Sequence, residues 1–230
     1  MAIVDKEFGE IKIRKNKLAR SVKLSVGVDG SLRASIPYYS PEFAVRRLVN
    51  GNRDEIRKML ATHNAKNSYQ DGDLIGKTHT LFLRKFSGEE IKISNEGNQI
   101  LVQIPQGLAF ENSLVQSEIR KTVSKILRKQ AKAYLPCRIT FLAEKYDFEF
   151  TKLRLSHTRT RWGSCSSSGT ISLNIALMNL PMHLIDYVII HELCHTRQMN
   201  HSQLFWKEVE QYDPEYKKHV EEMKKYSPNI

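Results

Sequence analysis

The sequence predicts an α+β fold, and two patterns carry this prediction. Short runs with apolar side chains at every second position, separated by glycine-containing turns, dominate residues 8–105, whereas apolar side chains at helical spacing dominate most of the rest. We therefore expect an antiparallel, β-rich amino-terminal part with an inserted helix, packed on a more helical carboxy-terminal part.

The first strands are predicted from their alternation. Between residues 8 and 36, Ile11 and Ile13 alternate with basic side chains, and a second apolar alternation over residues 22–26 leads to Asp29-Gly30. Asp-Gly between two alternating runs is a strong signal for a hairpin. This segment is therefore expected to form an antiparallel sheet.

A helical segment and further strands follow. Ser40-Pro41 supplies an N-cap and a first-turn proline for helix up to about residue 65, with an interruption at residues 50–52. Beyond residue 71, glycine-containing turns separate β-rich runs that include residues 80–86 and 100–104. More sheet is expected there.

Pro105-Gln106-Gly107 marks the expected junction between an amino-terminal domain, residues 1–105, and a carboxy-terminal domain, residues 106–230. No linker-like composition separates them, so both can belong to one compact unit. The elements expected after the junction are a helix from residue 114 to Pro136, a helix over 138–146, strands over 148–155, 159–164 and 170–175, and a helix that begins near Pro181.

The composition limits the class of protein. A chain of 230 residues with 40% hydrophobic residues can bury a core without disulfides, and its three cysteines form no CxxC pair. The amino-terminal stretch lacks the apolar segment of a signal peptide, and no run approaches the ~18 apolar residues that span a bilayer. We therefore expect a cytoplasmic protein without membrane insertion.

An HExxH motif, His191 to His195, lies in an apolar stretch that favours a helix. On an α-helix the two histidines are one turn and about 40° apart, so both imidazoles can bind one metal ion. Glu192 is not needed as a ligand and can act as the general base that takes a proton from metal-bound water. Two ordinary histidines on an amphipathic helix are the alternative interpretation.

A catalytic zinc site needs a third protein ligand, and His201 is the candidate. On a continuous helix His201 would lie ~15 Å from His191, too far to share one ion. We therefore expect the chain to turn back after about Arg197, and Ser202 to cap a new helix. The alternative third ligands are Glu208 and Glu215.

Four short segments around this motif carry a family resemblance. They are RWGSC at 161–165, ISLN at 171–174, HELCH at 191–195 and NHS at 200–202. Together they resemble the YgjP-like family of predicted zinc metallopeptidases, whose relatives include the SprT-like and WLM zincins. The resemblance implies a zincin-like carboxy-terminal part that holds Zn²⁺ through His191, His195 and His201, with Glu192 as catalytic base. It also implies a peptide or protein substrate.

Further residues near the motif are candidates for substrate binding. An edge strand can hold an extended peptide through main-chain hydrogen bonds, and we hypothesise this for the strand that contains Ile171, Ser172, Leu173 and Asn174. Arg161 can stabilise the oxyanion that develops during peptide hydrolysis. Sheet packing, or an ordinary place on the sheet surface, is the alternative for each of these residues.

The net charge of +11 leaves a second class of function open. Residues 11–23 hold six basic side chains and no acid, and six more basic side chains crowd the helix expected over 114–134. Such clusters can neutralise nucleic-acid phosphates, although solvated surface is the simpler explanation. The alternative function is a basic nucleic-acid-associated protein with a structural or vestigial metal site, or a DNA-associated protease as among SprT-like relatives. The sequence predicts no particular oligomeric state.

Overall fold

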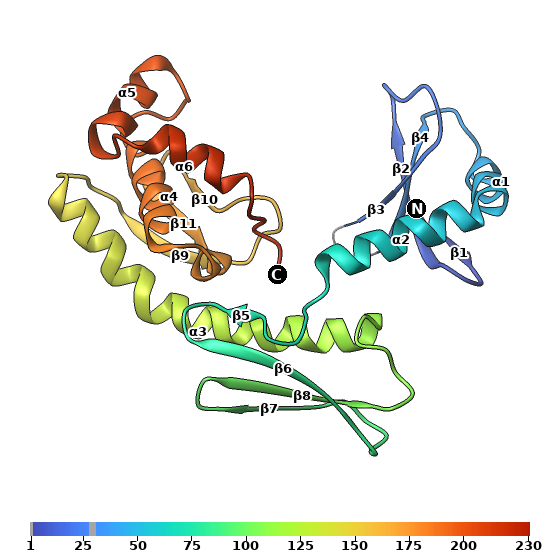
Figure 1. Ribbon diagram of the computed structural model, residues 1–230. Helices are drawn as coiled ribbons and strands as arrows, with labels where there is room; N and C mark the ends of the chain where they lie inside the picture. Colours follow the sequence, from blue (N-terminus) through green and yellow to red (C-terminus); the bar gives the residue numbers. More distant parts are fainter. Residues whose placement is uncertain (1, 28–30) are drawn as a thin grey trace. The chain divides into compact units, whose positions relative to one another are not determined.

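The computed structural model describes residues 2–27 and 31–230, apart from the side chains of residues 63–67 (Figure 1). It confirms the α+β fold, because the described residues form three sheets and several helices. The chain divides into two compact units: Met1–Tyr69 with Glu111–Gln116, and Gln70–Phe110 with Ser117–Ile230. The division into domains 1–105 and 106–230 stays a prediction.

The first unit contains a four-stranded sheet and two helices. Its elements are β1 (Ala2–Asp5), β2 (Gly9–Asn16), β3 (Lys23–Val26), β4 (Leu32–Pro37), α1 (Phe43–Gly51) and α2 (Arg53–Asn67). The strand order is β1-β2-β4-β3, and β2 runs parallel to β4, so the sheet is mixed where a wholly antiparallel one was expected. The physical reason is burial: β4 buries every second side chain and takes an interior position, whereas the half-exposed β3 stays at the edge.

Asp29 and Gly30, the expected hairpin turn, lie outside the described residues. The strands on either side of them, β3 and β4, pair in antiparallel register, with Val26 opposite Leu32. The expected interruption of the helical segment is confirmed, since α1 and α2 are separated at Asn52, whose Nδ2 donates to the carbonyl of Leu48 at 2.8 Å.

One face of this sheet forms the core of the first unit. Alternate residues of β2 and β4 are apolar and buried, and they pack against the two helices. The opposite face carries the intervening polar residues. The buried core residues are Ile3, Ile11, Ile13, Leu32, Ala34, Ile36, Val45, Val49 and Ile56.

The second unit begins with another four-stranded sheet. Its strands are β5 (Leu74–Ile75), β6 (His79–Phe86), β7 (Lys92–Glu96) and β8 (Gln99–Pro105), in the order β5-β6-β8-β7. The β-rich runs expected over 80–86 and 100–104 are confirmed within β6 and β8. These two strands are parallel, so this sheet is also mixed.

A single helix, α3 (Ser113–Lys145), contains Pro136, where the sequence predicted a break. Proline lacks an N–H for the helical hydrogen bond and disfavours a helix interior. The side chains of Leu135, Ile139 and Leu142 on either side of it are nonetheless buried in one continuous stripe. Their packing holds the helix through Pro136, and the two helices expected there are one.

The remaining elements carry the expected metal motif. They are β9 (Lys152–Ser156), β10 (Gly163–Cys165), β11 (Thr170–Asn174), a 3₁₀ turn (Ile175–Asn179), α4 (Met182–Cys194), α5 (Gln203–Tyr212) and α6 (Tyr216–Met223). α4 is apolar nearly all round and packs against β10, β11, α5 and α6, as a central helix does. No helix in the described part of the chain is both long enough and apolar enough to cross a membrane.

The hypothesis that the strand of Ile171, Ser172, Leu173 and Asn174 is a free edge is wrong. This strand, β11, lies in the middle of the sheet order β10-β11-β9, paired antiparallel with β10 and parallel with β9. Its main-chain N–H and C=O groups are therefore used in hydrogen bonds with the two neighbouring strands. The side chains of Ile171 and Leu173 are fully buried, and β10 is the edge strand next to α4.

Candidate metal centre

The HExxH motif occupies the last turn of α4. The helix ends at Cys194, and His195 is its C-cap. The chain then tightens into a turn in which the N–H of Gln198 donates to the carbonyl of Cys194 at 2.9 Å. Oγ1 of Thr196 donates to the carbonyl of Leu193 at 2.8 Å. These bonds satisfy carbonyl groups that the ending helix leaves without partners.

The turn ends at a new helix, as the sequence predicted. Ser202 is the N-cap of α5, and its Oγ accepts from the N–H of Phe205 at 3.4 Å. Oδ1 of Asn200 accepts from the N–H of Ser202 at 3.3 Å. The reversal brings His201, between these two polar residues, back toward the histidines of α4.

The three histidine rings converge on one point. Nε2 of His201 lies 3.2 Å from Nε2 of His191 and 3.2 Å from Nε2 of His195. Nitrogens bound at ~2.0–2.1 Å to a tetrahedral zinc ion are roughly 3.3–3.4 Å apart, so the arrangement fits such an ion. Among the described residues these three form the group able to hold a metal ion, and each offers one ligand atom that lies within 4.8 Å of the other two.

Neighbouring groups fix the orientation of the rings. Nδ1 of His195 lies 2.9 Å from the carbonyl of Gln198, so it donates its proton there and leaves Nε2 as the metal-binding atom. Phe205, which is fully buried, stacks on His195 with ring centroids 4.4 Å apart and meets the rings of His191 and His201 edge-on. Burial lowers the pKa of His191 to about 3 and also lowers that of His195, which favours the neutral imidazoles that bind metals.

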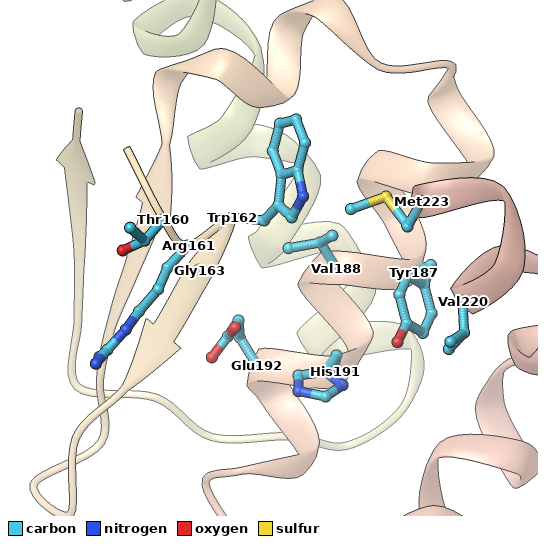
Figure 2. A pocket seen from close by; sticks show the side chains of 10 residues that line it. All are labelled: Thr160, Arg161, Trp162, Gly163, Tyr187, Val188, His191, Glu192, Val220 and Met223. Atoms are coloured by element: carbon cyan, nitrogen blue, oxygen red, sulfur yellow. The ribbon is translucent and has the colours of Figure 1, made fainter. Parts of the chain in front are cut away.

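Glu192 points from α4 into a pocket beside the histidines (Figure 2). Its side chain is buried, and Oε2 has no hydrogen-bond partner in the described chain. Burial raises the pKa of Glu192 to about 8, and the positive charge of Arg161 acts in the opposite direction. A buried polar atom without a partner is uncommon and indicates a group poised for a ligand or for catalysis.

The pocket has a polar side and an apolar side (Figure 2). Arg161 and Gly163 lie on the strand side, across from Glu192. The apolar side is formed by Trp162 of the strand segment, Tyr187 and Val188 of α4, and Val220 and Met223 of α6.

The sequence located only part of this pocket. Tyr187 and Val188 precede His191 by four and three residues, so helical spacing alone would have placed them on its face. Val220 and Met223 belong to a later helix, and no local pattern connects them to the motif.

The other predicted residues take different places. Asn174 is buried, and its Nδ2 donates to the carbonyls of Thr158 at 2.6 Å and Arg161 at 2.8 Å, so it braces the loop that carries Arg161. Glu208 forms an ion pair with Arg197 at 3.2 Å, and Glu215 pairs with Lys218. Neither glutamate belongs to the group of residues able to hold the metal.

Comparison with known proteins gives a family match and two similar structures. The crystal structure of the metallopeptidase zymogen of Pyrococcus abyssi abylysin is 28% identical over 39% of this chain and 92% of its own, with a TM-score of 0.36. That of Methanocaldococcus jannaschii jannalysin, also a metallopeptidase zymogen, is 21% identical over 39% of this chain and 93% of its own, with a TM-score of 0.36. No curated protein sequence matches significantly.

The family model described as the YgjP-like metallopeptidase domain matches residues 20–226. The match includes the HExxH helix, the following turn and most of the first compact unit. Because it spans most of the sequence, the chain belongs to the YgjP-like family of metallopeptidases.

Proposed function

We propose that the protein is a zinc-dependent peptidase in which His191, His195 and His201 hold the metal and Glu192 is the general base. The observation that carries this proposal is the convergence of three Nε2 atoms next to a buried carboxylate oxygen without a partner. Three imidazoles match the donor set of catalytic zinc sites that leave one position open. Zinc bound there supplies a Lewis acid that polarises the scissile carbonyl and lowers the pKa of a water molecule.

Two side chains of the protein transfer the proton and stabilise the negative charge that develops during hydrolysis. Oε2 of Glu192 accepts the proton of the attacking water and delivers it to the leaving amine. Arg161, which faces Glu192 across the pocket, stabilises negative charge on the carbonyl oxygen. Gly163 leaves the space that the glutamate carboxylate occupies.

The substrate is held by an edge strand and an apolar wall. β10 is at the edge of its sheet and beside α4, so we assign to β10 the main-chain contacts with an extended peptide. Trp162, Val188 and Met223 surround the space next to Glu192, and they favour a peptide with an apolar side chain beside the cleaved bond.

The test compares wild type with Glu192→Gln in a broad peptide-library cleavage screen, with the zinc content of each measured. We expect both to hold one zinc per chain, the variant to lose cleavage by at least ~100-fold, and wild-type cleavage sites to be enriched in apolar residues. Glu210→Gln, an exposed glutamate on α5, is the matched control and should retain activity. Equal turnover by wild type and Glu192→Gln would reject the base assignment.

A further inference from the structure

The outward face of the first sheet is strongly basic. On β2, β3 and β4 the residues that alternate with the apolar core positions lie on the face of the sheet opposite to the one that packs against α1 and α2. In the register of the sheet, Lys12 lies opposite Arg33, and Ser35 lies between Arg14 and Lys23. The polar residues of this face on the three strands are Glu10, Lys12, Arg14, Asn16, Lys23, Ser25, Arg33 and Ser35, so four basic side chains accompany one acid, which lies at the start of β2.

Two hollows lie on this face. The first is lined by Lys12, Arg14 and Arg33, with serines and Asn16 between them. The second, at the end of β2, is lined by Arg20 and Lys23 with Asn16, Ser21 and Ser35 among its neighbours. The described residues that line the two hollows include no acid, so both combine positive charge with neutral hydrogen-bond donors.

Exposed tyrosines stand where β2 and β4 end. Tyr38 directly follows β4, is 48% exposed, and has the ammonium groups of Lys15 and Lys17 each 5.9 Å from its ring centroid. Tyr39 is 94% exposed. Large aromatic rings left in solvent beside lysines are available for stacking against a flat ligand.

We propose that this face binds single-stranded nucleic acid, with phosphates against the basic side chains and unpaired bases against Tyr38 and Tyr39. Residues two apart on a strand are ~6.6–6.8 Å apart, so β2 presents Lys12 and Arg14 as a row that can follow a sugar–phosphate backbone. Tyr38 and Tyr39 follow β4 at the end of the sheet where β2 also ends, although Lys15, which flanks Tyr38, alternates with Lys12 and Arg14 along β2. Exposed rings at this end favour an unpaired strand, because bases inside a duplex are already stacked. The inference concerns the first compact unit and does not depend on peptidase activity.

The test measures fluorescence anisotropy of a labelled oligonucleotide of about 20 nucleotides with the full chain at about 50 and 200 mM salt. Lys12→Gln/Arg14→Gln/Lys23→Gln should weaken binding at least ~10-fold at the lower salt and flatten the logarithmic salt slope by about 2. The matched control, Lys125→Gln/Lys129→Gln/Lys132→Gln on α3, removes the same charge and should bind within ~2-fold of wild type.

A second variant tests the stacking contact. Tyr38→Ala/Tyr39→Ala should weaken binding about 10-fold and leave the salt slope unchanged, because it removes no charge. Circular dichroism verifies that each variant is folded. The proposal is overturned if wild type shows no salt-dependent binding, if both triple variants lose affinity equally, or if polyglutamate or anionic vesicles compete as well as unlabelled oligonucleotide.

Discussion

Gly163 and Glu192 approach so closely that a β-carbon on Gly163 would lie 2.6 Å from Oε1 of the glutamate. Gly163 has no positive φ, so its backbone places no demand for glycine. Glycine is required here for steric reasons, because β10 can lie beside α4 with the carboxylate of Glu192 between them only where the strand carries no side chain. Gly163 is therefore expected to set the position of the base.

Gly163→Ala tests this relationship. The added methyl group forces the carboxylate or the strand to move, and a shift of about 1 Å near reacting atoms can reduce turnover about 100-fold. We expect at least a ~10-fold loss of kcat with zinc content unchanged, measured on a cleaved library peptide. Gly107→Ala, where a β-carbon meets nothing within 4 Å, is the control and should behave as wild type. Full activity in Gly163→Ala would show that the close approach has no catalytic role.

His201→Ala should remove the metal. Loss of one of three ligands leaves two imidazoles, and we expect zinc affinity to fall by more than ~100-fold. This loss is larger than the one expected when a residue that only hydrogen-bonds to a metal ligand is removed. The measurement is zinc content after dialysis, followed by competition with a chromophoric chelator. His183→Ala is the control, since His183 lies on α4 as His191 does, but pairs with Glu222 at 2.9 Å and lies outside the metal-binding group. Unchanged zinc stoichiometry in His201→Ala would contradict the assignment.

The sequence predicted the features of this site that depend on local geometry. The one-turn spacing of His191 and His195 follows from helical rise, and the return of His201 follows from the need to bring a third ligand within reach. Sheet order and the apolar wall depend on contacts between distant segments. Nothing within residues 170–175 shows that two other strands flank β11, and nothing near the motif places Met223 of α6 in the pocket.

Arg197 stabilises the turn between α4 and α5, which places His201 next to the other two histidines. Its guanidinium donates to Oε1 of Glu208 at 3.2 Å, to the hydroxyl of Tyr212 at 3.1 Å and to the carbonyl of Asp147. It also lies over the ring of Phe148, 4.2 Å from the centroid. These contacts connect the turn between α4 and α5 to other elements of the second unit.

Arg197→Ala should therefore weaken zinc binding about 10-fold, within the range seen when groups that support metal ligands are removed. Competition with a chelator measures this change, and a thermal melt shows whether the fold persists. Lys207→Ala removes an exposed positive charge from α5 and should leave zinc affinity unchanged. If both variants bind zinc as wild type does, the turn holds His201 without Arg197.

Asp5 joins the β1–β2 turn to α2 and should make the first unit sensitive to acid. Its carboxylate pairs with Arg53 at 2.9 Å and accepts from the N–H groups of Glu7 at 2.9 Å and Phe8 at 3.1 Å. The hydrogen bond from Arg53, together with that from the N–H of Glu7, lowers the pKa of Asp5 below the ordinary value of an aspartate. Because the folded-state pKa is the lower one, this stabilisation is fully present above the unfolded-state value and is lost as the pH falls through the folded-state value.

Asp5→Asn should accordingly destabilise the first unit by about 1 kcal/mol at pH near 7, and the difference from wild type should shrink below pH ~4. Both tryptophans, Trp162 and Trp206, belong to the second unit, so their fluorescence does not report on this region. Hydrogen exchange of peptides that cover β2 and β4 measures the local opening free energy directly. Asp54→Asn, which removes an exposed carboxylate from α2, is the control. If the difference in opening free energy between wild type and Asp5→Asn stays constant down to pH ~3, the ionised carboxylate of Asp5 contributes nothing to stability.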